Sequence, residues 1–189
     1  GDHAGYVFYY MLLKIYESLI HELEAVKDSI QHVENNIFKG REREMVIAIS
    51  EVSRNLLDFK RAISLHDEML QSFEIAGRKF FGEEFGHHLR AMHGEYFKIE
   101  SALRSNIDFL RELRETNDSL LSSKQNELTK RFTVIAFIAI PLTLVASLFQ
   151  IESRARPIIG SDNDFWILIG LLLFIGGILF AFFKHKKLL

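Results

Sequence analysis

Residues 132–149 read FTVIAFIAIPLTLVASLF, and residues 165–183 read FWILIGLLLFIGGILFAFF. Neither stretch contains a charged side chain, and each is about the length of 17–25 residues that an α-helix needs to cross the hydrocarbon core of a bilayer. A buried core helix of a soluble protein is the alternative, but two such stretches in tandem argue against it. The sequence therefore predicts two transmembrane helices, joined by a short outer loop over 150–164.

The basic residues around these stretches predict how the chain is oriented. Two lie between the stretches, Arg154 and Arg156, and six flank the pair on its outer ends: Lys124, Lys130, Arg131, Lys184, Lys186 and Lys187. Because Lys and Arg are enriched on the cytoplasmic side of membrane proteins, both termini are predicted to be cytoplasmic. The chain is thus expected to be a multi-pass protein of the inner (cell) membrane, with a basic cytoplasmic tail over 184–189.

Residues 1–131 show the apolar periodicity of long helices and are predicted to form a cytoplasmic stalk. Steps of three and four predict a first helix over about 7–38, with an apolar face of Leu12, Ile15, Leu19, Leu23, Val26, Ile30, Val33 and Ile37. Lys39-Gly40 marks a break, since Gly accepts the left-handed conformation that often closes a helix. The periodicity then runs from Met45 to Phe73 without a slip, which predicts an antiparallel helix hairpin.

A third apolar seam begins after a Gly-rich break and continues into the first apolar stretch. It consists of Phe85, Leu89, Met92, Tyr96, Ile99, Leu103, Asn106, Leu110, Leu113, Asn117 and Leu120. From Phe85 to Phe149 a continuous helix would be roughly 100 Å long at about 1.5 Å per residue. Such a rod needs partners for its seam, so we expect a homo-oligomer. Asn106 and Asn117 either fix the register from buried positions or face water.

Few residues outside the apolar stretches indicate chemistry. The absence of Cys excludes disulfides and thiolate metal sites. His87, His88 and His93 could indicate a metal site, but a polar helix face is favoured because no acidic partner stands at ligand spacing. His66 on the second seam is either a pH-responsive group or a satisfied core imidazole. No nucleophile elbow, phosphate loop or zinc-protease helix is found, so neither an enzyme nor direct nucleic-acid binding is predicted.

Two local motifs resemble the CorA family of magnesium channels. Lys124-Gln125-Asn126-Glu127, followed by Pro141-Leu142-Thr143, resembles the membrane-entry stretch of that family, Lys-x-Asn-Glu and then Pro-Leu-Thr, with matching spacing. The closing Phe183 and its basic run through Leu189 resemble the end of the family. The resemblance implies a homopentamer in which the first span lines the pore and the second faces lipid. Since the chain opens with Gly1 rather than Met, we also expect an N-terminal cytoplasmic domain upstream.

The resemblance also implies functional positions. The pore-facing positions of the family correspond here to Asn126, Thr129, Phe132, Ile140 and Thr143. Polar rings would lie at the cytoplasmic end, and apolar constrictions between them can gate by dewetting. Single apolar positions could instead pack between helices. Lys184, Lys186 and Lys187 would form a basic cytoplasmic ring. No cofactor is certain, Mg²⁺ is a possible ligand, and no metal-binding residue is assigned.

One motif departs from the family. Where members place Gly-Met-Asn beyond the first span, this sequence has Gln150-Ile151-Glu152, with Arg154 nearby. Repeated around a symmetry axis, these four residues would form an outer mouth in which carboxylate and basic rings compete over a Debye length of about 8 Å. We therefore expect a pore less selective than a magnesium channel, monovalent or weakly cation-selective. The alternative is a solvated connector with no role in selectivity.

Three functions are compatible with these features. The first is a CorA-like ion channel that a cytoplasmic ligand, divalent ion or nucleotide, gates through the stalk. The second is a membrane effector of a type III CRISPR antiviral defence system, opened by a nucleotide messenger, because channels of that kind resemble this layout. The third is a non-conducting, membrane-anchored coiled-coil scaffold, which predicts no axial cavity.

Overall fold

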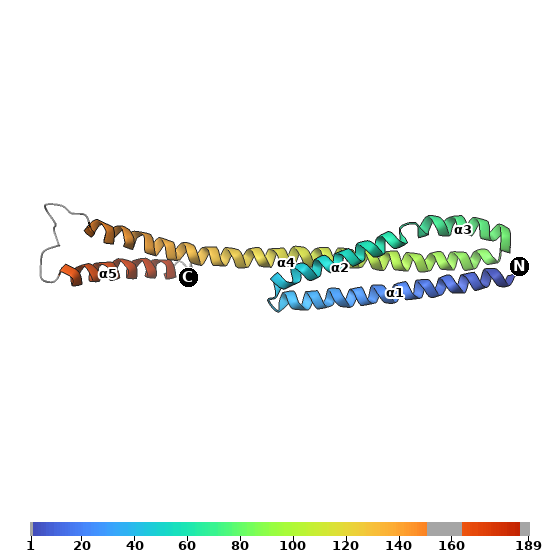
Figure 1. Cartoon of the computed structure of the whole chain (residues 1–189), viewed down its shortest axis with the longest axis horizontal. Coiled ribbons are helices and arrows are strands. Elements are labelled where there is room, and N and C mark those ends of the chain that lie inside the picture. The colour runs from blue at the N-terminus through green and yellow to red at the C-terminus, as the bar shows by residue number, and fades with distance from the viewer. Residues whose placement is uncertain (1, 151–163, 186–189) are drawn as a thin grey trace. The chain divides into compact units, whose positions relative to one another are not determined.

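The computed structural model describes residues 2–150 and 164–185. Regular structure in these ranges is α-helical throughout, as Figure 1 shows: α1 (Asp2–Phe38), α2 (Glu42–Ile63), α3 (His66–Phe81), α4 (Phe85–Gln150) and α5 (Asp164–His185). The chain divides into a stalk unit, Gly1–Leu121, and an apolar unit, Ser122–Leu189. The predicted all-helical fold, with a third helix continuing into the first apolar stretch, is confirmed. The membrane boundaries at 131/132, 149/150, 164/165 and 183/184 stay predictions.

In the stalk unit, α2 and α3 run antiparallel to α1 and to the first part of α4 (Figure 1). The turn after α1 has the hydrogen bonds of a Schellman motif, from Arg41 N–H to the Asn36 carbonyl at 3.1 Å and from Gly40 N–H to the Ile37 carbonyl at 3.0 Å. Gly40 has φ 86°, which side-chain-bearing residues rarely adopt. The predicted hairpin and its break at Lys39-Gly40 are therefore confirmed.

The prediction of an unbroken second helix over Met45–Phe73 is wrong. Ser64 and Leu65 form a turn that separates α2 from α3. The Ser64 hydroxyl donates to the Arg61 carbonyl at 2.9 Å, and the Ser64 N–H reaches the same carbonyl. A Ser side chain that bonds to a nearby carbonyl in this way competes with the helical ladder. The apolar periodicity passes through the turn, because Ile63 and Leu70 are both buried.

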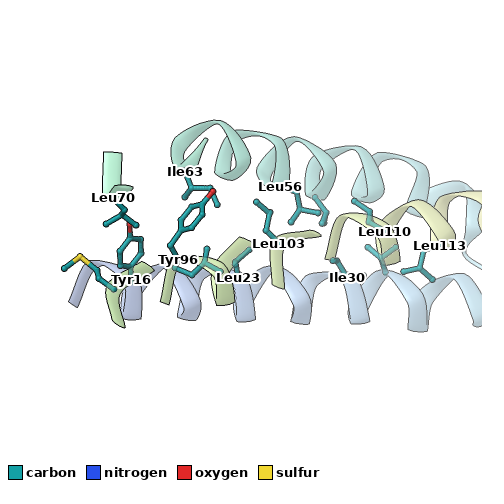
Figure 2. Close-up of a cluster of buried hydrophobic side chains, with 14 of the residues drawn as sticks. Tyr16, Leu23, Ile30, Leu56, Ile63, Leu70, Tyr96, Leu103, Leu110 and Leu113 are labelled. Carbon is teal, nitrogen blue, oxygen red and sulfur yellow. The ribbon is translucent and has the colours of Figure 1, made fainter. Parts of the chain in front are cut away.

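The apolar seams meet in a single core, and Figure 2 shows its layers of Leu, Ile and Tyr side chains between the helices. On α4 the predicted seam is buried from Phe85 to Asn117, and Leu120 is half-buried. On α1 one position was predicted wrongly. Tyr16 is buried while Ile15 is 44% exposed, because α1 presents a slightly rotated face to its neighbours. α1 also begins earlier than predicted, at Asp2.

The two Asn residues of the α4 seam are buried, so the hypothesis that they face water is wrong. The side-chain amide of Asn106 donates to the Leu23 carbonyl of α1 at 3.3 Å. Asn117 is 1% exposed, and neither its Nδ2 nor its Oδ1 has a hydrogen-bond partner among the described residues. A buried polar group without a partner costs about 1–3 kcal/mol. Asn117 therefore weakens the core that contains it.

We predict that Asn117→Leu raises the free energy of unfolding by about 1–3 kcal/mol, because it removes an unsatisfied amide. The matched variant Asn106→Leu should gain less, since it gives up the bond to the Leu23 carbonyl. Urea titration of the purified chain measures both. Equal effects of the two variants would contradict the assignment. If Asn117 specifies how copies associate, native mass spectrometry of Asn117→Leu should show mixed oligomers.

Candidate functional site: the uncovered face of the apolar unit

The apolar unit consists of the second part of α4 and the whole of α5. Among the described residues two helices are long and apolar enough to cross a membrane, α4 within Phe85–Leu148 and α5 over Trp166–His185. The two lie against each other. The rings of Phe137 and Phe183 have centroids 6.1 Å apart, and a Cβ on Gly176 would lie 3.5 Å from Leu142 Cδ1.

The helix α5 covers one side of α4. Val134 of α4 is buried, and Pro141, Leu142 and Val145 are half-buried. The predicted pore-lining residues are all exposed: Asn126, Thr129, Phe132, Ile140 and Thr143. At about 100° per residue these five positions lie within about 120° of one another, on the side opposite Val134 and Leu142. They form one face of the helix, the uncovered face.

The uncovered face exposes large apolar side chains. Phe132 is 70% exposed and Ile140 is 66% exposed, and Val134 is the only buried residue among those of the apolar unit whose side chains are described. An apolar surface of this kind is unstable in water and needs lipid, a partner or both. A core helix of a soluble protein would instead be mostly buried. Two membrane helices, surrounded by lipid and by neighbouring copies, would therefore explain the exposed apolar side chains of this unit.

In the apolar unit, two threonine hydroxyls of α4 form hydrogen bonds within their own helix. The Thr143 hydroxyl donates to the Ala139 carbonyl and the Thr133 hydroxyl to the Thr129 carbonyl, each at 2.8 Å. Pro141 lacks an N–H, so the Phe137 carbonyl loses its usual helical donor while α4 continues through this position. The hydroxyl oxygens keep free lone pairs, which can accept from water or meet a cation.

Several predicted site residues lie outside the described residues. These are Ile151, Glu152 and Arg154 of the outer mouth and Lys186 and Lys187 of the basic tail. Gln150 ends α4, and its side chain is likewise not described. Lys184 lies exposed in the last turn of α5, where the negative end of the helix dipole stabilises a cation. The structure brings the five predicted pore positions onto one face and leaves the outer mouth and basic ring as predictions.

The model of one protein family, described as CorA-like Mg²⁺ transporter protein, matches residues 2–185 of this chain. The chain belongs to this family. The cobalt/magnesium transport protein CorA of Thermotoga maritima is 24% identical over 184 residues, which are 97% of this chain and 52% of that protein. The protein of the same name from Methanocaldococcus jannaschii is 18% identical, over 96% of this chain and 57% of its own length.

A solved structure agrees with the fold of this CorA-like chain. The CorA magnesium transporter of Methanocaldococcus jannaschii superposes with a TM-score of 0.82 at 18% identity, over 95% of this chain and 57% of that one. The chain thus spans about half the length of the relatives that it matches. The resemblance predicted from the motifs is confirmed. Because the family consists of ion transporters, the prediction that the chain is not an enzyme is confirmed as well.

Two histidines of the CorA-like chain occupy sites that sequence reasoning missed. His93 Nε2 lies 2.6 Å from Asp67 Oδ1, which joins α4 to α3. His88 is half-buried, with its ring 5.1 Å from those of Tyr6 and Tyr9. The favoured interpretation of the His87–His93 group as a polar helix face therefore holds only for the exposed His87. The Asp67 partner could not be found from spacing along α4, because it lies 26 residues upstream.

His66 is half-buried at the start of α3, where its Nδ1 lies 3.4 Å from the Tyr16 hydroxyl oxygen. Burial, together with the nearby Tyr96, raises the pKa of Tyr16 to about 12, so this hydroxyl keeps its proton and can donate to His66. In the described parts of the CorA-like chain, no three His, Cys, Asp or Glu side chains are grouped as metal ligands. His66 thus has the partner expected of a satisfied core imidazole.

We predict that Asp67→Asn removes an acid-sensitive part of the stability of the stalk unit. The hydrogen bond from His93 holds the pKa of Asp67 below its ordinary value of 3.8. A lowered carboxyl pKa stabilises the fold above the unfolded value, and this contribution is lost as the pH falls through the folded value. Melting temperatures recorded between pH 7 and pH 2 should fall more steeply for the wild type than for Asp67→Asn. Parallel curves would contradict the prediction.

Proposed function

We propose that this chain is the stalk and pore part of a homo-oligomeric, CorA-like cation channel in the inner (cell) membrane. In this proposal α4 lines the pore with its uncovered face, α5 faces lipid, and both termini are cytoplasmic. The observation that carries it is the placement of α5 opposite the five predicted pore positions. Had α5 packed on Ile140 and Thr143, those side chains would have been closed to ions.

In a symmetric assembly, neighbouring copies of the chain would cover the uncovered face. Copies of α4 arranged around an axis would turn these faces toward one another and enclose a path whose walls alternate between Asn or Thr and apolar side chains. Polar residues at membrane depth tend to face such a cavity. Five copies follow from the family resemblance. Native mass spectrometry in detergent tests the number, and a monomer at all protein concentrations would overturn the proposal.

We further propose that the channel prefers magnesium less than Gly-Met-Asn members of the family do. Gln150-Ile151-Glu152 replaces the signature, and the basic Arg154 follows two residues after Glu152. A ring of carboxylates attracts cations, while a ring of guanidinium groups nearby repels divalent ions more than monovalent ones.

Flux assays on proteoliposomes test this selectivity. The expected result is K⁺ or Na⁺ flux that equals or exceeds Mg²⁺ flux, and Arg154→Gln should shift the ratio toward Mg²⁺. A pore that passes Mg²⁺ and excludes monovalent ions would contradict the selectivity proposal, although it would leave the channel proposal intact.

Two other functions remain as outcomes of the same assay. A nucleotide-gated effector of a type III CRISPR system would stay closed at every Mg²⁺ concentration and open when a nucleotide is added. A coiled-coil scaffold would stay silent under all ligands. Flux that falls as internal Mg²⁺ rises would instead indicate gating by the transported divalent ion.

A further inference from the structure

The stalk unit contains a groove between α2 and α4 that the pore does not use. It consists of two neighbouring hollows, of about 220 and 380 Å³. Ile107 and Arg111 of α4 line both hollows and join them. The larger hollow is in the range of known small-ligand sites, about 300–1,000 Å³. The groove is therefore large enough to hold a small molecule that bridges the two helices.

The walls of the groove are apolar at the base and cationic at the rim. Leu56, Ile63, Leu103 and Leu110 are buried members of the core that also line it. Four basic residues surround these side chains: Lys60, Arg104, Arg111 and Arg114. Such a combination of apolar base and convergent charge suits an amphipathic ligand.

The acids of the groove do not balance its basic residues. Glu100 pairs with Arg104 at 3.0 Å, and Asp108 pairs with Arg111 at 3.3 Å. These exposed pairs within α4 are weak, and a ligand phosphate can compete with them. Lys60 of α2 and Arg114 of α4 make no ion pair with a described residue. Lys60 lines the larger hollow and Arg114 lines the smaller one, so a ligand that spans both hollows would meet an unpaired cation on each wall.

We propose that the α2–α4 groove binds an organic polyphosphate, whose phosphates contact the cationic rim while its apolar or aromatic part lies over Ile107. Guanidinium groups bind phosphate through paired hydrogen bonds, and the ammonium of Lys60 adds a point charge. A ligand that bridges α2 and α4 favours one spacing of these helices, which would couple its binding to the pore. That regulatory role rests on the proposed channel function, whereas the binding site itself does not.

Calorimetric titration of the purified full chain in detergent tests the site. The buffer contains EDTA, and the probes are ATP, tripolyphosphate and adenosine. ATP is expected to bind more tightly than tripolyphosphate, and adenosine not at all. Binding should weaken as salt rises. Absence of ATP binding, equal affinity for ATP and adenosine, or tripolyphosphate binding as tight as ATP would each overturn the proposal.

A matched pair of double variants locates the site. Lys60→Gln with Arg114→Gln should weaken ATP binding at least about tenfold, because both unpaired cations of the rim are lost. Arg54→Gln with Lys79→Gln removes the same charge from exposed positions outside the groove and should change affinity less than about twofold. Equal losses would show a general charge effect and overturn the site. A melting curve without ligand verifies that each variant is folded.

Flux through proteoliposomes, with and without ATP, separates the two proposals. Intact flux without ATP binding refutes the groove and leaves the channel. ATP binding without flux refutes the channel function and leaves the groove.

Discussion

Ile140→Ala is expected to raise the basal ion flux of the reconstituted chain about tenfold, because it widens a proposed apolar constriction and lowers the barrier by about 1.4 kcal/mol. That energy is less than the transfer free energy of two methylene groups, at about 0.8 kcal/mol each. The loss of apolar side chain in Ile140→Ala is therefore large enough to account for it. Ile140 lies on the uncovered face of α4 and is 66% exposed in the single chain.

The control for this variant is Ile135→Ala on the same helix. Ile135 is 60% exposed, but it lies about 140° around the helix from Ile140. The chemical change and the exposure are therefore nearly the same, and only the face differs. Flux of K⁺ into proteoliposomes at equal protein content measures both variants. If Ile135→Ala opens the pore and Ile140→Ala does not, the wrong face of α4 has been assigned to the axis.

Ile99→Ala is expected to lower the free energy of unfolding by about 2–5 kcal/mol, the usual cost of a cavity left by a large buried side chain. Ile99 is 0% exposed at the centre of the α4 seam, in the core shared by the stalk helices. For a chain of this size the apparent melting temperature should fall by roughly 5–15 °C.

Ile47→Ala provides the comparison, because Ile47 on α2 is 68% exposed and an exposed substitution usually changes stability by less than about 0.5 kcal/mol. Differential scanning fluorimetry in detergent at one fixed scan rate measures both variants. Similar melting temperatures for the two would mean that the seam is not the core of the stalk unit in solution.

Much of the fold followed from local sequence features. The two uncharged stretches predicted the apolar helices, and steps of three and four predicted nearly every buried position of α4. The break at Gly40 was predicted as well, because the ability of Gly to adopt the left-handed conformation depends on the residue type and not on tertiary contacts. The five pore positions came from a family resemblance rather than from periodicity. The structure places them on one uncovered face, and their role as a pore lining stays a prediction.

Other features could not be read from the sequence because they depend on contacts between distant residues. The turn at Ser64–Leu65 interrupts a seam whose periodicity shows no slip. The pairing of His93 with Asp67 joins residues on two helices. Asn106 has a partner 83 residues away, whereas Asn117 has none among the described residues, and their sequence context is similar.

The sequence by itself determined which segments are helical, which of them are apolar enough to cross a membrane, and which side of α4 is apolar in the stalk. Periodicity and composition suffice to predict these three features, since each feature is a property of a single helix. Only the tertiary structure decided which side of the apolar part of α4 meets α5, and that α2 and α4 leave a cationic groove between them. An almost wholly apolar helix has no polar face to set its rotation, so packing against its neighbour decides it.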